Sequence, residues 1–170
     1  MGLSGDAMLS AVRAAFGERL LDAHQQCGDA TVVVGRDDAP AIFAALRDTP
    51  EFAFDLLIDC TAVDYLGESP RFEVVYHLYS LAQNHRLRVK IRVPEDEAWV
   101  HSLVPLWKAA NWLERECWDM FGIRFVGHPD PRRILMYEQF VGHPLRKDYP
   151  VEKRQPLTAE RDPIEVGWKV

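Results

Sequence analysis

The chain has 170 residues, 48% of them hydrophobic and 27% charged, with 20 basic and 26 acidic residues for a net charge of −6. This composition is typical of one soluble globular domain. The longest uninterrupted apolar run, Ala41 to Leu46, is too short to cross a bilayer, and the acidic excess counts against nucleic-acid binding.

The first third of the chain predicts a helix, a hairpin and a second helix. Apolar residues recur at helical spacing in DAMLSAVRAAFG, and Gly17 ends that pattern. LLDAHQQCGDATVVVG predicts two strands joined at Gly28-Asp29. DDAPAIFAALRDTP predicts a helix with Asp38 as its N-cap and Pro40 in its first turn.

Three strands are predicted next, over residues 52–66, 71–81 and 85–93, because all three stretches are rich in β-branched and aromatic residues. Their short connections predict an antiparallel meander. In the third strand, apolar residues that face a core alternate with Arg86, Arg88, Lys90 and Arg92. This cationic face is either a solvated sheet surface or a patch that meets an acidic partner.

Residues 95–122 predict helices after Pro94 ends the sheet. Three acidic residues, Glu95 to Glu97, stand where anions suit a helix N-terminus. Further along, one apolar stripe runs at steps of three and four residues, and Gly122 supplies a left-handed C-cap. Arg115 and Asp119 are expected to pair on the opposite face. The stripe comprises Leu106, Ala109, Ala110, Leu113, Cys117, Met120 and Phe121.

The sequence changes character after Ile123. Residues 124–170 hold six of the 11 prolines and a net charge of +2 from 9 basic and 7 acidic residues, yet they keep apolar residues that favour burial. We therefore expect an α/β body, residues 1–123, followed by an extended Pro-rich C-terminal arm, residues 124–170. Such an arm either wraps its own body or covers a neighbour. Its apolar residues include Ile134, Leu135, Met136, Tyr137, Phe140, Leu145, Tyr149 and Trp168.

Candidate chemistry near the arm is sparse. Glu114, Glu116 and Asp119 lie close in sequence, with His128 soon after, but their helical angles spread over roughly 200°, so the three carboxylates cannot share one cleft. An acid/base pair formed by one of them remains an alternative. No nucleophile elbow, GxGxxG or phosphate loop is present. The three cysteines form no CxxC, which counts against a metal ribbon or cluster in this chain.

Gly-His-Pro occurs twice, at residues 127–129 and 142–144, each time followed by two basic residues. A metal site, an anion site, a nucleic-acid patch and a protein-docking tail are the alternatives. A metal site would use His128 and His143 with Asp130 or Asp148, a spacing that matches no compact zinc pattern. Two stiff turns fit the residues better, since Gly permits a positive φ and Pro restricts the backbone conformation of the chain that leaves the turn.

The stretch ERECWDMFGIRFVGHPDPRRIL, followed by GHPLRKDYP, resembles the C subunit (30 kDa type) of NADH–quinone oxidoreductase, respiratory complex I. That family's signature is Glu-Arg-Glu, an acid three residues later, two apolar residues, a histidine, a basic residue and two final apolar residues. This chain meets every fixed position. MYEQF departs from the more usual Thr-Asp-Tyr-Gly-Phe, so the resemblance does not fix the subgroup.

The predicted elements together indicate an α+β fold, with a mainly antiparallel sheet packed against helices, and this pattern is compatible with the family. The resemblance implies a non-catalytic scaffold in the peripheral arm of a proton-pumping enzyme, on the cytoplasmic face of the bacterial inner membrane. The enzyme passes electrons from NADH through FMN and iron–sulfur clusters to quinone. These groups would sit in partner subunits, and this chain would hold no catalytic residue, cofactor or metal.

The implied partners are the D subunit, which forms much of the quinone pocket, and neighbouring peripheral-arm subunits. Two alternatives stay open: the equivalent subunit of a ferredoxin-driven complex or membrane-bound hydrogenase, and a stand-alone enzyme that uses Glu114 and His128. The signature and docking candidates are Glu114, Arg115, Glu116, Asp119, His128, Arg132, Arg133, His143, Arg146 and Lys147.

Overall fold

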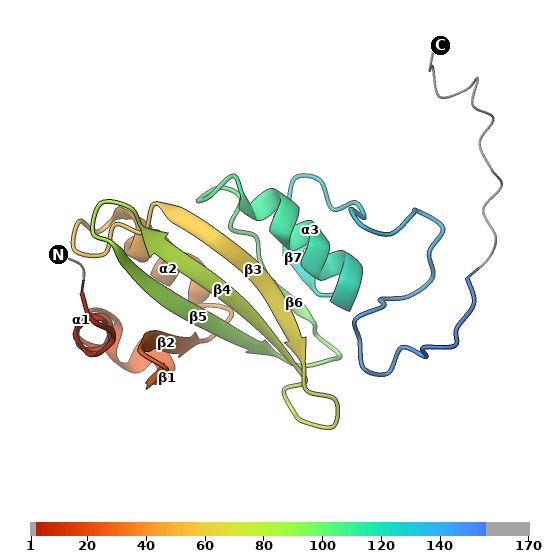
Figure 1. The fold of residues 1–170 in the computed structure, drawn as a ribbon, viewed down its shortest axis with the longest axis horizontal. Helices are drawn as coiled ribbons and strands as arrows, with labels where there is room; N and C mark the ends of the chain where they lie inside the picture. The colour runs from red at the N-terminus through yellow and green to blue at the C-terminus, as the bar shows by residue number, and fades with distance from the viewer. Residues whose placement is uncertain (1–2, 156–170) are drawn as a thin grey trace, which may run out of the picture.

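The computed structural model describes residues 3–155 and shows an α+β fold (Figure 1). A five-stranded sheet has α2 behind it, with α1 beside β1 and β2 and α3 beside β3. The elements are α1 (Gly5–Phe16), β1 (Leu20–Gln26), β2 (Asp29–Val34), α2 (Ala39–Asp48), β3 (Leu56–Asp64), β4 (Phe72–Ser80), β5 (His85–Val93), β6 (Trp99–His101), α3 (Ala110–Phe121) and β7 (Arg124–Val126), with a 3₁₀ turn at Gly17–Arg19.

The sheet has the strand order β1-β2-β5-β4-β3. The predicted antiparallel meander is confirmed, because β3 pairs with β4 and β4 with β5 in antiparallel register. The predicted hairpin is also confirmed as β1 and β2. Local patterns did not reveal that β2 pairs with β5 in parallel, which joins the hairpin to the meander as one sheet.

The core lies between the sheet and its helices. Cys60 and Tyr76 stand directly opposite each other on β3 and β4, so their side chains share one face of the sheet. The Phe43 ring of α2 contacts the Tyr76 ring edge-on, and the sulfurs of Cys60 and Cys117 lie 4.0 Å apart. Both cysteines are buried, and burial raises the pKa of the Cys60 thiol.

Both helices predicted near the N-terminus form. Gly17, with φ of +50°, follows the last residue of α1. The second helix begins after Asp38, but the expected side-chain cap is wrong. The Asp38 carboxylate instead accepts a hydrogen bond of 3.0 Å from Arg19 Nε.

The alternating strand β5 buries its apolar side, as predicted, while its cations lie on the other face. Every one of these cations lies within 4.0 Å of a carboxylate of the same chain, so the face is largely neutralised. This arrangement fits a solvated sheet surface, and the alternative of a patch for an acidic partner stays a prediction. The pairs are Arg86 and Arg88 with Asp29, Lys90 with Glu73, and Arg92 with Glu68 and Glu73.

The helix prediction for residues 95–109 is wrong. This stretch contains strand β6 and a series of turns, and β6 pairs in parallel with β7. The acidic residues there do not cap a helix, because Glu95 pairs with Arg71 and Glu97 with Arg36. The true helix starts at Ala110, so Leu106 and Ala109 of the predicted stripe lie outside it.

From Gly127 to Gln155 the chain runs through turns and bends without a helix or strand. The predicted boundary between body and arm at Ile123 stays a prediction, although β7 lies beyond it and pairs with β6 of the body. Trp168 lies outside the described residues. No helix within residues 3–155 has both the length and the apolar character needed to span a membrane.

Candidate functional site

The signature residues lie on different sides of α3. Glu114 and Asp119 are buried, Arg115 is partly buried and Glu116 is exposed. The sequence argument that the three carboxylates cannot share a cleft is confirmed by these different environments. Gly122 ends the helix with φ of +80° as predicted, and a Cβ at this position would lie 2.7 Å from the His143 ring.

Glu114 holds the loop that follows β6. One carboxylate oxygen accepts a 2.7 Å hydrogen bond from the Ser102 hydroxyl, and the other accepts a 2.6 Å bond from the Leu103 N–H. His128 Nε2 lies 4.0 Å from the same carboxylate. Burial raises the pKa of Glu114 to about 7, although both hydrogen bonds favour the ionised form. Both carboxylate oxygens of Glu114 thus accept hydrogen bonds that hold this loop in place.

Glu114→Gln is expected to change how stability depends on pH. The pKa of Glu114 is raised from 4.5 to about 7, so the folded state binds more protons between these values, and stability falls as pH rises through this window. Relative to the glutamine variant, the natural chain should lose up to about 3 kcal/mol of unfolding free energy between pH 4.5 and pH 8. Urea unfolding across this range measures the difference.

The matched control is Glu116→Gln, which changes an exposed carboxylate on the same helix. Its stability should follow that of the natural chain at every pH. If the curves of Glu114→Gln and the natural chain run parallel, Glu114 does not titrate in this window.

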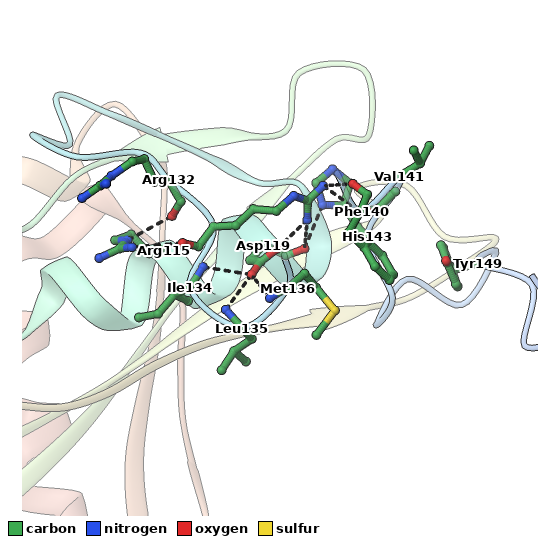
Figure 2. Close-up of polar contacts among 12 residues, drawn as sticks. Arg115, Asp119, Arg132, Ile134, Leu135, Met136, Phe140, Val141, His143 and Tyr149 are labelled. Carbon is green, nitrogen blue, oxygen red and sulfur yellow. Dashed lines mark hydrogen bonds and ion pairs between the residues drawn. The ribbon is translucent and has the colours of Figure 1, made fainter. Parts of the chain in front are cut away.

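Asp119 fixes the arm to the end of α3 (Figure 2). Its buried carboxylate accepts three consecutive backbone N–H groups of the arm, those of Ile134, Leu135 and Met136, at 2.9–3.0 Å. Arg133 Nη1 donates to the second oxygen. Burial alone would raise the pKa of Asp119, but these donors outweigh it and lower the pKa below its ordinary value. We call this arrangement the Asp119 anchor.

The predicted pair between Arg115 and Asp119 is wrong. Arg115 instead donates from Nε and Nη2 to the backbone carbonyls of Arg132 and Arg133, each at 3.0 Å. Both residues therefore hold the arm, through separate contacts (Figure 2). Helical spacing could place the two side chains within reach of each other, but it could not show that the arm offers both of them closer partners.

A second anchor joins the arm to the sheet. The buried guanidinium of Arg71, the residue just before β4, makes two hydrogen bonds of 2.8 Å with the carboxylate of Asp64. It also reaches Glu95 at 2.6 Å and Asp148 of the arm at 2.9 Å. Asp64 accepts the Lys147 N–H at 2.8 Å as well. We call this arrangement the Arg71 anchor.

Sequence reasoning missed the Arg71 anchor. Its carboxylates come from three separate segments, and no short motif connects them. Hydrogen bonds from Arg71 lower the pKa values of Asp64 and Asp148, and the same bonds raise that of Arg71. Arg146, a predicted docking residue, belongs to this cluster through Glu95 and Asp148.

Both Gly-His-Pro elements form turns, with φ of +86° at Gly127 and +107° at Gly142. His128 Nε2 lies 3.0 Å from the Asn111 carbonyl, whereas His143 Nδ1 lies 3.0 Å from the Asp119 carbonyl. These carbonyls are eight positions apart on α3, roughly 12 Å along the axis. The two imidazoles thus contact α3 at separate points. The described residues, 3–155, contain no group of three potential metal ligands, and the absence of a metal stays a prediction.

The predicted docking residues therefore fall into two groups. Glu116, Arg132 and Lys147 are exposed, although Arg132 pairs with Asp130. The remaining candidates make polar contacts within their own chain. Glu114 holds the loop after β6, and the others join the arm to the body. Whether any of them touches a partner stays a prediction. The residues with such internal contacts are Glu114, Arg115, Asp119, His128, Arg133, His143 and Arg146.

Residues 32–155 match the family model described as "Respiratory-chain NADH dehydrogenase, 30 Kd subunit". The chain is similar to the C subunit of NADH-quinone oxidoreductase from Geotalea uraniireducens, with 46% identity over 141 residues that cover 83% of this chain and 85% of that protein. It is also similar to the C subunit from Acidithiobacillus ferrooxidans, with 51% identity over 142 residues, 80% of this chain and 70% of that protein.

Two solved structures share the fold. A trypsin-resistant fragment of Nqo5 is 32% identical, with a TM-score of 0.64, and the match covers 74% of this chain and 97% of the fragment. A chain of the archaeal membrane-bound sulfane sulfur reductase is 22% identical, with a TM-score of 0.70 and coverage of 87% and 86%. The second match concerns the fold alone.

Proposed function

Because the chain belongs to the family of the 30 kDa subunit of respiratory-chain NADH dehydrogenase, we propose that it is a scaffold subunit in the peripheral arm of a proton-pumping NADH–quinone oxidoreductase. In this proposal it carries no cofactor and no catalytic residue. Partner subunits hold FMN, the iron–sulfur clusters and the quinone. The complex works at the cytoplasmic face of the bacterial inner membrane, and this chain contacts the D subunit.

The arrangement of the arm supports a docking role. Through buried Asp119 and Arg71, the two anchors hold backbone N–H groups of the arm, Arg133 and Asp148 against the body. Large apolar side chains on the arm remain exposed: Leu135 by 56%, Val141 by 56% and Leu145 by 54%. An arm with polar contacts inward and apolar side chains outward offers a ready surface to a second protein. This is the observation on which the docking proposal depends.

Prior ordering of the arm favours such docking. A free arm would lose conformational entropy on binding, which weakens association. The two anchors restrict the arm before any partner arrives, so less entropy remains to be lost. The proposal thus assigns the signature residues an indirect part in assembly, in which they shape the arm that makes the contacts.

Leu135→Ser combined with Leu145→Ser is expected to reduce assembly while the fold stays intact. Both side chains are more than half exposed in the isolated chain, so stability should change by no more than about 0.5 kcal/mol for each. If they are buried against a partner, their loss should reduce co-purification of the complex at least tenfold. Mass spectrometry of the co-purified chains provides the measurement and identifies the enzyme.

The matched control is Leu81→Ser, which changes a leucine of 66% exposure between β4 and β5. This variant should assemble like the natural chain. If the double variant also assembles normally, the apolar face of the arm does not dock. Turnover of NADH by the isolated chain would instead favour a stand-alone enzyme.

A further inference from the structure

A hollow of about 370 Å³ lies between α3, β7 and the start of the arm. Its apolar lining comes from Trp118, Phe125, Val126 and Pro131. Both anchoring carboxylates, Asp119 and Asp64, lie outside this lining. We call this hollow the α3/β7 pocket. Its size matches the lower end of the range for small binding sites in proteins, so it can admit one or two side chains.

The charged groups of the pocket favour a negatively charged occupant. Arg124 lines the pocket and is exposed, and it forms no ion pair or side-chain hydrogen bond with residues 3–155. Arg115 also lines it; two of its guanidinium nitrogens serve the arm, and the third lies 3.9 Å from Asp130. A carboxylate placed between these guanidinium groups would gain charge-assisted hydrogen bonds.

Glu114, the acidic residue in the lining, opposes the binding of a negatively charged occupant only weakly. Both oxygens of Glu114 are occupied by Ser102 and Leu103. Its pKa of about 7 leaves a large fraction of the group uncharged at neutral pH. The pocket therefore combines apolar walls with one cation, Arg124, that has no ion-pair partner within residues 3–155. Its occupant must present an apolar group beside an anion.

A polypeptide meets both requirements with two neighbouring side chains. We propose that the α3/β7 pocket receives an acidic segment of a partner subunit, with one large apolar side chain between Trp118 and Val126 and a neighbouring carboxylate on Arg124. This inference rests on the proposed function, because it assigns the pocket to a subunit of the same complex. The exposed Val126 side chain continues the pocket to the surface, where such a segment can enter.

Photocrosslinking in the assembled complex tests the proposal. A benzophenone amino acid in place of Val126, which is 49% exposed, should crosslink to a partner peptide that contains an acidic residue beside a large apolar residue. Arg124→Glu should reduce the yield of this crosslink at least fivefold, whereas Arg124→Lys should keep most of it. Lys108→Glu is the control, because Lys108 is exposed and does not line the pocket.

The other outcomes overturn the inference. Crosslinks to residues 156–170 of the same chain would assign the pocket to its own C-terminal segment. A partner peptide without an acidic residue, or equal yields with Arg124→Glu and Lys108→Glu, would contradict the charge argument. If the complex assembles normally in these cases, the proposed function stands without this inference. A chain that co-purifies with no partner overturns both.

Discussion

Arg71→Met is expected to lower the free energy of unfolding by about 3–5 kcal/mol, because it leaves buried carboxylate charge without a counterion. Arg71 is 4% exposed and Asp64 3%, so water cannot replace the lost partner. Glu95 and Asp148 lose the same guanidinium. Chemical denaturation measures the change, and hydrogen exchange at Lys147 should show whether the arm leaves the sheet.

Two further variants separate charge from packing. Arg71→Met combined with Asp64→Asn should recover part of the stability, since no unpaired buried carboxylate remains at Asp64. Arg86→Met serves as the control, because the Arg86 side chain is 66% exposed and its carboxylate partner is 4.0 Å away. It should change stability by less than about 0.5 kcal/mol. Equal effects of Arg71→Met and Arg86→Met would contradict the role of the Arg71 anchor.

Asp119→Ala is expected to release the arm from α3. The substitution leaves three backbone N–H groups and the Arg133 guanidinium without their acceptor, at a cost of about 1–3 kcal/mol for each neutral group that stays buried. Detachment of the arm avoids this cost. The amides of residues 134–136 should therefore lose most of their protection from hydrogen exchange, and assembly with partner subunits should fall.

Asp119→Asn and Glu116→Gln calibrate this result. The asparagine keeps one acceptor oxygen but loses the charge that pairs with Arg133, so its effect should lie between those of alanine and the natural residue. Glu116 is exposed on the same helix, and its replacement should leave exchange at residues 134–136 unchanged. If Asp119→Ala leaves both exchange and assembly unchanged, the Asp119 anchor does not hold the arm.

The two anchors also predict how the arm responds to acid. Donors from Arg71 and from the arm lower the pKa values of Asp64, Asp119 and Asp148 in the folded state. The folded state then binds fewer protons than the unfolded state, and the stabilisation is lost as pH falls below the ordinary carboxylate range, near pH 4. This direction is opposite to that of Glu114, so the arm and the loop held by Glu114 differ in their response to pH.

Much of the fold could be predicted from local sequence patterns. The alternation in β5 follows from the period of a strand, and it revealed which side chains enter the core. Gly122 revealed the end of α3, because a left-handed C-cap favours glycine. The helix prediction for residues 95–109 is wrong because the apolar residues of this stretch also fit a helical period. Pairing with β7, which lies further along the chain, makes part of the stretch strand β6.

The sequence by itself determined the elements of residues 5–93, the helix that ends at Gly122, the family signature and the two Gly-His-Pro turns, because each depends on neighbouring residues. Only the tertiary structure decided what the charged signature residues do. Helical spacing assigned Asp119 to Arg115, but the folded arm offers Asp119 three N–H groups and Arg133. Nothing near Arg71 in the sequence pointed to Asp148. The partners of a buried charge are the groups that folding brings next to it, whatever their distance in sequence. Burial removes water from these groups, so a charged group left without a partner costs free energy.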